Sequence, residues 1–403
     1  MSTPVSSTFQ EPVYLNALGL CCALGVGAEV VAKRVFHDPP VPGVQVSSAF
    51  LGRELMVGLV PGEVPSLDDL PLALQGRNNA LLRLALDDLG GALHAVLDGI
   101  DATRVAIVLG SSTSGIAETE RAFRHRDASG ALPADFHYAM QEMGAPARFV
   151  AHALGLQGAA SSVISTACSS SAKALATAAR LIRSGRADVV IAGGADSLCG
   201  FTLAGFSALE AVSPERCMPF SANRCGINIG EGAALFIVSR RPGPVRLCGW
   251  GESADAHHMS APDPGGRGAV LAIESALRCA GRTASDIDYV NLHGTGTAQN
   301  DAMEAPVSAA LYAAGTPMSS TKPLTGHTLG AAGAIEAALC WLMLARNPEH
   351  RLLPHLWDGV ADPALPHLHF AAPGECARRP LRHVASHSFA FGGSNAALVL
   401  GAA

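Results

Sequence analysis

The chain has 403 residues, of which 49% are hydrophobic and 15% are charged, so it can bury a large core and is not a disordered protein. This length exceeds the usual size of a single hydrophobic core, and two linked halves are expected. The 28 lysines and arginines are outnumbered by 34 acidic residues and form no basic run, which argues against nucleic acid as a partner.

Strands are predicted where short apolar runs end in glycine or polar turns, over residues 13–18, 104–109, 163–165, 188–192 and 233–238. Apolar residues at helical spacing predict helices over residues 81–97, which Gly90 and Gly91 interrupt, and over residues 169–182. Residues 240–244, with two prolines and a glycine, predict a connection between halves. A helix over 269–279, a strand over 289–292, a helix over 331–344 and a strand over 396–400 follow. This alternation indicates a layered α/β fold.

A weak internal similarity supports two related halves. The turn over residues 164–168 leads into a helix of small residues, and the turn over residues 319–327 leads into another. Two related halves would place these two turns opposite each other.

Cys168 lies in the first of these turns, between a strand and a helix. The positive end of the helix dipole is expected to lower the thiol pKa and favour the thiolate. The free N–H groups of the first helical turn can also receive an oxyanion. The alternative interpretation is a buried cysteine at a helix cap, with the neighbouring serines as capping residues.

Two histidines lie in turns of similar character. His293 follows a strand and opens a loop of Gly and Thr, while His327 precedes a helix, where the dipole opposes protonation. We expect Lys322 to pair with a carboxylate, Glu304 in preference to Asp301, and so to fix the orientation of the histidines. The alternatives are core histidines and ordinary ion pairs. The remaining histidines show no metal-ligand spacing, and no metal site is expected.

Two aromatic residues lie among the glycines of residues 388–395, and they predict a mobile loop. The N–H group of Phe389 is a candidate for completing an oxyanion hole. A phosphate-binding loop is the alternative, although no lysine and no following helix support it. The segments 193–196 and 230–233 are interpreted as tight structural turns at strand ends.

Five motifs together are similar to one family. Residues 166–170, 193–196, 293–297, 322–333 and 389–395 have the order and spacing found in β-ketoacyl-[acyl-carrier-protein] synthases. The chain resembles the branch with a Cys-His-His triad, over residues 13–401. The resemblance implies a thiolase-like fold, with two similar halves in a five-layer αβαβα arrangement. Residues 1–240 would carry the nucleophile and residues 241–403 both histidines.

The resemblance also implies a role for each matching residue. Cys168 is the nucleophile, and His293 and His327 stabilise the enolate formed by decarboxylation. Lys322 organises the site together with Glu304. The N–H groups of Cys168 and Phe389 form the oxyanion hole, and Phe389 is the gating phenylalanine. Four further residues are expected to contact substrate: Thr295, Thr297, Phe391 and Ile227.

The implied activity is a decarboxylative Claisen condensation of an acyl-enzyme thioester with malonyl-acyl carrier protein, in fatty acid, polyketide or polyene elongation. No bound cofactor is expected, because the substrate is carried on the phosphopantetheine arm of the carrier protein. The expected partners are acyl carrier protein and a second subunit, identical or related, in a cytoplasmic dimer without a membrane span. The alternatives are an active ketosynthase subunit paired with a chain-length-factor-like partner, and a non-decarboxylating thiolase-like acyltransferase.

Some positions depart from the family pattern. Cys225 stands where Asp is usual, Ile227 where an aromatic residue is usual, and His387 where Asn is usual. These departures lie near the expected acyl pocket and carrier-docking rim, and they favour specialised metabolism. Candidate docking residues for an acidic carrier protein are Arg77, Arg83, Arg121 and Arg124.

Overall fold

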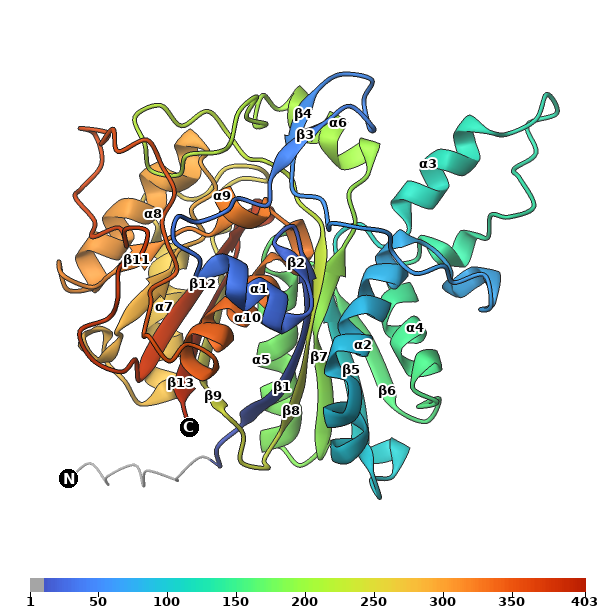
Figure 1. Ribbon diagram of the computed structural model, residues 1–403, viewed down its shortest axis with the longest axis horizontal. Coiled ribbons are helices and arrows are strands. Elements are labelled where there is room, and N and C mark those ends of the chain that lie inside the picture. Colours follow the sequence, from blue (N-terminus) through green and yellow to red (C-terminus); the bar gives the residue numbers. More distant parts are fainter. Residues whose placement is uncertain (1–10) are drawn as a thin grey trace.

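A computed structural model of the protein describes residues 11–403 (Figure 1). Ten strands form one mixed sheet in the order β11-β10-β12-β13-β9-β1-β8-β7-β5-β6, and β2 (Gly25–Val26) pairs with β1 off this path. The first half contributes β1 (Tyr14–Cys22), β5 (Val105–Gly110), β6 (Ala160–Ile164), β7 (Val189–Asp196) and β8 (Gly232–Ser239). The second half contributes β9 (Val245–Ala254), β10 (Tyr289–Asn291), β11 (Met318–Ser319), β12 (His383–Ala390) and β13 (Ser394–Ala402).

The two halves of the sheet have the same topology. Strands β6, β5 and β7 are parallel, and β8 and β1 follow them in antiparallel pairing. Strands β11, β10 and β12 are likewise parallel, and β13 and β9 follow in antiparallel pairing. In each half the chain therefore visits the strands in the same spatial order. Strand β1 joins the two half-sheets, because it pairs with β9. This pairing is short and involves Tyr14 and Leu15 of β1.

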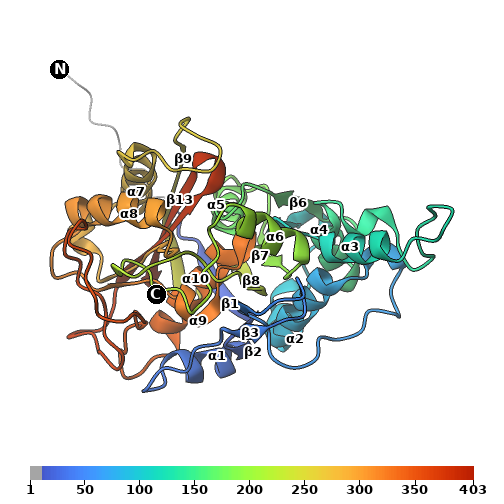
Figure 2. The ribbon, with the colours of Figure 1, turned by 90° about the horizontal axis from the view of Figure 1, so that it is seen from above.

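Helices complete the five layers. Helices α5 (Ser170–Arg183) and α10 (Ala332–Ala345) contact each other and strands of both half-sheets (Figure 2). Helices α2 (Arg77–Leu97) and α4 (Ala145–Ala153) cover the outer face of the first half-sheet. Helices α7 (Arg267–Ala280) and α8 (Ala298–Leu311) lie outside the second. The expected thiolase-like αβαβα fold is confirmed.

The remaining elements lie at the edges of these layers. They are α1 (Ala28–Val35), α3 (Ile116–Arg124), α6 (Gly200–Ala208), the short α9 (Lys322–Thr325) and the hairpin of β3 (Gln45–Ser47) and β4 (Leu55–Val57). Within residues 11–403, no helix combines the length and the apolar character that a membrane crossing requires.

Small residues allow the two helices of the middle layer to meet. Every residue of α10 from Ala332 to Met343 is buried, because a helix between two sheets has no solvent face. A Cβ atom added at Gly333 would lie 2.8 Å from the Cβ of Ala172 in α5. The abundance of Ala and Gly in the sequence therefore sets how closely α5 and α10 approach.

Helix α2 includes the predicted helix and is kinked at Gly90, whose φ is 46°, as the glycines in its sequence indicated. Two other sequence-based interpretations differ from the structure. Gly193 and Gly194 lie inside β7 and not in a turn. The segment predicted as a mobile loop is instead the end of β12, a short turn over Phe391–Gly393 and the start of β13. The aromatic residues and glycines misled the prediction, because Ser388 and Phe389 are buried within β12 and the glycines form the tight turn of a hairpin.

Candidate active site

Cys168 lies in the turn between β6 and α5 and is 6% exposed. The turn is tight: Ala167 has a φ of 51°, and the Ser170 hydroxyl donates to the carbonyl oxygen of Ala167 over 2.6 Å. The hydroxyl oxygen of Ser170 accepts the N–H of Thr166 over 2.9 Å. The polar residues of this turn therefore hold each other and fix the cysteine at the start of the helix.

Burial raises the pKa of the Cys168 thiol to about 11. The positive charge of Lys322 and the backbone N–H groups of Phe391 and Cys168 act in the opposite direction, and they do not offset the desolvation. The expectation of a lowered thiol pKa was wrong, because burial of the thiol outweighs the favourable effect of the helix start. At neutral pH the free site therefore holds a protonated thiol.

Two backbone N–H groups hydrogen-bond the Cys168 sulfur. One is that of Cys168 itself, and the other belongs to Phe391, where Phe389 was expected. The reason is the hairpin geometry: Phe389 is still within β12 and pairs with Asn395, whereas the chain turns at Phe391. Phe391 is 36% exposed, and its ring lies 5.5 Å from the ring of Phe206. The ring of Phe389 is buried and lies 6.2 Å from the His293 ring.

His327 reaches the cysteine from the other half of the protein. Its Nε2 atom lies 3.0 Å from Cys168 Sγ. Its own backbone is anchored, since its N–H donates to the carbonyl oxygen of Asn228 and its carbonyl oxygen accepts the N–H of Gly230. Burial, and then the charge of Lys322, holds the pKa of His327 well below its ordinary value. The predicted neutral imidazole agrees in direction, although burial and not the helix dipole is the main cause.

His293 follows β10 and is held by Glu304 of α8. The carboxylate of Glu304 accepts the N–H groups of His293 and Gly294, each over 2.7 Å. Gly294 has a φ of 37°, in the left-handed region that favours glycine. Burial, followed by Lys322, holds the pKa of His293 well below its ordinary value.

The proton of His293 can be assigned from its neighbour. Its Nδ1 atom lies 3.4 Å from Lys322 Nζ, and an ammonium group offers only donors. Nδ1 must therefore accept, and the neutral ring carries its proton on Nε2. This leaves His293 with an N–H group to donate elsewhere.

Lys322 is buried, and its partner is Glu336 of α10, not Glu304 as expected. The ammonium group donates to the Glu336 carboxylate and to the backbone oxygen of His293. Burial raises the pKa of Glu336 to about 7, although Lys322 lowers it. The sequence analysis missed Glu336 because it is a single charged residue in an otherwise apolar helix. Its contact with Lys322 arises only when α10 folds back against that lysine.

Asp301, the second carboxylate considered for Lys322, holds a different part of the site. It accepts the N–H of Phe220 over 2.7 Å, and burial raises its pKa to about 6. Another acid missed from the sequence, Asp196, accepts the N–H of Gly330 over 2.6 Å and that of Thr113 over 2.8 Å. Asp196 therefore fixes the start of the segment that leads from His327 into α10.

Cys168, His293 and His327 line one cavity, and the sulfur and one nitrogen of each ring lie within 4.8 Å of one another. Five of the other residues expected in the site share its wall: Thr295, Thr297, Ile227, Phe389 and Phe391. Lys322 and Glu304 lie behind the histidines. The cavity encloses about 40 Å³, which admits water but no acyl chain, so substrate entry requires side chains to move.

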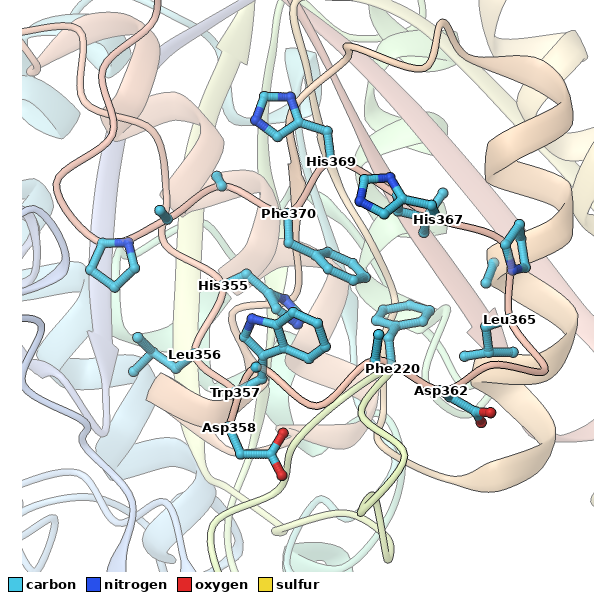
Figure 3. Close-up of a pocket in the computed structure, with 18 of the residues that line it drawn as sticks. Phe220, His355, Leu356, Trp357, Asp358, Asp362, Leu365, His367, His369 and Phe370 are labelled. Carbon is cyan, nitrogen blue, oxygen red and sulfur yellow. The ribbon is translucent and has the colours of Figure 1, made fainter.

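A larger cavity of about 880 Å³ lies elsewhere (Figure 3). Phe370 stacks on His355 with 4.2 Å between ring centroids, and its ring lies 5.3 Å from that of Phe220. Phe220 closes this cavity on the side of the active-site turn, because a Cβ atom at Gly294 would lie 2.9 Å from its ring. The larger cavity contains none of the three converging residues, so we place the chemistry in the smaller one.

The four arginines considered for carrier docking each lie beside a carboxylate. Arg77 donates to the buried Glu231 over 2.8 Å and therefore has a structural role. The other three form surface pairs at 3.3 to 3.7 Å: Arg83 with Asp87, Arg121 with Asp135, and Arg124 with Glu120. These contacts weaken the case for any of the four as a docking residue.

Family models and known proteins are similar to this chain. Residues 80–242 match the β-ketoacyl synthase N-terminal domain, and residues 245–355 match the C-terminal domain. The chain is 39% identical to 3-oxoacyl-[acyl-carrier-protein] synthase 2 of Rhizobium meliloti (strain 1021) over 264 residues, 61% of each chain. It is 30% identical to Nodulation protein E of the same strain, over 96% of this chain and 98% of the relative.

A solved structure is similar over its whole length. It is the ketosynthase ApeO in complex with its chain length factor ApeC, from Xenorhabdus doucetiae. The match has a TM-score of 0.88 and 40% identity, and it covers 100% of both chains. The chain belongs to the β-ketoacyl synthase family of condensing enzymes.

Proposed function

We propose that this chain is a β-ketoacyl-[acyl-carrier-protein] synthase that joins an acyl group on Cys168 to a malonyl unit with loss of CO2. The observation that carries the proposal is the convergence of Cys168 Sγ with His327 Nε2 at 3.0 Å, beside a neutral His293 in the same cavity. A nucleophile with an adjacent base is the arrangement required for covalent acyl transfer.

In the first half-reaction, the Cys168 sulfur attacks the carbonyl carbon of an acyl-carrier thioester. The thiol proton passes to His327 Nε2, which is neutral and close enough to accept it. The N–H groups of Cys168 and Phe391 stabilise the oxyanion of the tetrahedral intermediate. The carrier thiolate then leaves and takes the proton, so Cys168 holds the acyl group as a thioester.

In the second half-reaction, a malonyl-carrier thioester loses CO2, and the electron pair of the broken bond forms an enolate. His293 donates from Nε2 to the thioester oxygen. His327 is the second donor in its Nε2-protonated tautomer, which is open to it once Cys168 is acylated, because its Nδ1 has no hydrogen-bond partner within residues 11–403. The enolate carbon attacks the acyl-Cys168 carbonyl carbon, a carbon–carbon bond forms, and the Cys168 thiolate leaves and takes a proton from solvent. Lys322 cannot supply the oxyanion contact, because its ammonium group is engaged with Glu336 and the His293 backbone.

Intact-mass spectrometry tests the first half-reaction. The wild-type chain, Cys168→Ala and the matched control Cys340→Ala are incubated with a panel of acyl-carrier thioesters. We expect one acyl adduct on the wild type and on the control, and none on Cys168→Ala. Folded wild-type protein that takes no acyl group from any donor would refute the proposal for this chain acting alone.

Release of labelled CO2 from malonyl-carrier thioester tests the second half-reaction. A non-decarboxylating thiolase-like acyltransferase would load Cys168 and release no CO2, so the two assays together separate this alternative. We also propose that the substrate is bound to a carrier protein and that the enzyme is cytoplasmic. We further propose that the chain divides into residues 1–240 and residues 241–403. The identical strand order of the two half-sheets supports the division.

We also consider a heterodimer with a chain-length-factor-like subunit. Its support is the full-length similarity, at 40% identity, to a ketosynthase solved with its chain length factor. Light scattering on the purified chain separates the cases. A stable homodimer that loads acyl groups favours the homodimeric enzyme, whereas a chain that aggregates alone and loads only when co-expressed with a related subunit favours the heterodimer.

A further inference from the structure

His387 lies on the same face of β12 as Phe389 and is fully buried behind the active site. Its Nε2 atom lies 3.0 Å from the hydroxyl of Tyr312, at the end of α8. Its Nδ1 atom lies 3.4 Å from Glu304 Oε1 and has no hydrogen-bond partner within residues 11–403. His387 thus bridges the end of α8 to the carboxylate that holds the His293 turn.

Glu304 has few groups available to satisfy a buried charge. Its oxygens accept the N–H groups of His293 and Gly294 and, over 3.2 Å, the side-chain amide of Asn300. The buried Lys322 is committed to Glu336 and to the His293 carbonyl oxygen. A further buried acid, Asp301, accepts from the same Asn300 amide. His387 is therefore the side chain left to face Glu304 Oε1.

We propose that His387 is a positioning residue for His293, acting through Glu304. Glu304 Oε1 offers only an acceptor to Nδ1 of His387, so the proton of a neutral ring belongs on Nδ1, and Nε2 then accepts from the Tyr312 hydroxyl. This Nδ1–H group faces Glu304 Oε1 and keeps the carboxylate against the backbone of His293 and Gly294. The inference rests on the proposed function, in which His293 donates to the thioester oxygen.

The geometry assigns the two ring nitrogens different tasks, and two amide side chains can test them separately. Asn places its amide where Nδ1 of histidine lies, so His387→Asn keeps a donor toward Glu304 but cannot reach Tyr312. Gln places its amide nearer to Nε2, so His387→Gln keeps the Tyr312 contact and loses the one to Glu304. His387→Leu removes both.

The experiment measures both half-reactions for these variants. His387→Leu and His387→Gln are expected to lower kcat for malonyl-carrier decarboxylation about tenfold to a hundredfold, with KM nearly unchanged, because His293 is misplaced. His387→Asn should stay within about threefold of wild type. Acyl loading of Cys168 should be nearly constant throughout, because His387 does not contact the sulfur or His327.

Controls separate positioning from loss of structure. His383→Asn changes a half-buried histidine at the other end of β12 and should affect neither half-reaction. Thermal unfolding identifies any variant that fails to fold. Tyr312→Phe should reduce decarboxylation in the wild-type background but not further in His387→Asn, since the tyrosine acts only through the imidazole.

The possible outcomes are distinguishable. If Asn and Gln are equally impaired, or if all three His387 variants decarboxylate like wild type, the positioning role is wrong. A wild-type enzyme that releases no CO2 would instead refute the proposed function. Rescue by Asn but not by Gln would support the role assigned to Nδ1.

Discussion

Cys168 and His327 occupy corresponding positions in the two halves of the protein, and their side chains meet. Cys168 lies between β6, the third strand of the first half, and α5. His327 lies between β11, the third strand of the second half, and α10. The 3.0 Å contact between Sγ and Nε2 therefore joins two copies of one structural unit, as the weak internal similarity of the sequence predicted.

Alkylation of Cys168 should depend steeply on pH. Because burial raises the thiol pKa to about 11, the thiolate fraction should grow about tenfold per pH unit from pH 7 to pH 10. Iodoacetamide modification followed by peptide mass spectrometry measures the rate. The exposed Cys376 in the same sample provides the comparison. A Cys168 rate that is already constant above pH 8 would contradict the raised pKa.

The two histidines should differ in their effect on the half-reactions. His293→Ala and His327→Ala are each expected to reduce malonyl decarboxylation about 100-fold or more, because each removes a donor to the enolate. His327→Ala should also slow acyl loading, since this ring contacts the sulfur. Stopped-flow loading and CO2 release measure the two steps. Equal loading rates for both variants would argue against proton transfer to His327.

The pairing of Lys322 with Glu336 should be visible in stability. Glu336→Gln leaves a buried ammonium group without its carboxylate and should cost about 3–5 kcal/mol of unfolding free energy. The surface pair of Arg104 and Asp188 is the control, and Asp188→Asn should cost less than about 1 kcal/mol. Urea unfolding measures both. Similar losses for the two variants would show that burial adds nothing to the first pair.

Alkaline pH should destabilise the fold. Burial raises the pKa of seven thiols, which therefore keep their protons in the folded state above pH 9 while the unfolded chain releases them: Cys21, Cys22, Cys168, Cys199, Cys217, Cys248 and Cys340. The unfolded state then binds fewer protons, so stability falls by up to about 1.4 kcal/mol per thiol and pH unit.

Urea unfolding under reducing conditions between pH 7.5 and 10.5 measures this slope. Cys340→Ala should make it shallower, because one buried thiol is removed. Cys376→Ser, at an exposed position, should leave it unchanged. An unfolding free energy that stays constant to pH 10.5 would contradict the expectation.

The sequence predicted the elements whose patterns are local. Glycines and polar turns mark the strand and the helix on either side of Cys168. They also mark the positions of His293, at the end of a strand, and of His327, before a helix. The partners were not found, because Glu336 and Phe391 meet Lys322 and Cys168 only in three dimensions. The predicted shift of the Cys168 pKa had the wrong direction for the same reason. The sequence shows that a helix starts at the cysteine, but it does not show that the sulfur is buried.

The Gly333–Ala172 contact has a consequence for how this enzyme can evolve. Cys168 and His327, the proposed nucleophile and its base, come from separate halves. Their separation therefore depends on the spacing of α5 and α10, where the methyl group of Ala172 packs against Gly333, which has no side chain. A larger side chain at this contact would touch neither Cys168 nor His327. It would push α5 and α10 apart and so increase the distance between Sγ and Nε2. Substitutions in the helices of the middle layer can therefore abolish activity even when every reactive residue is unchanged.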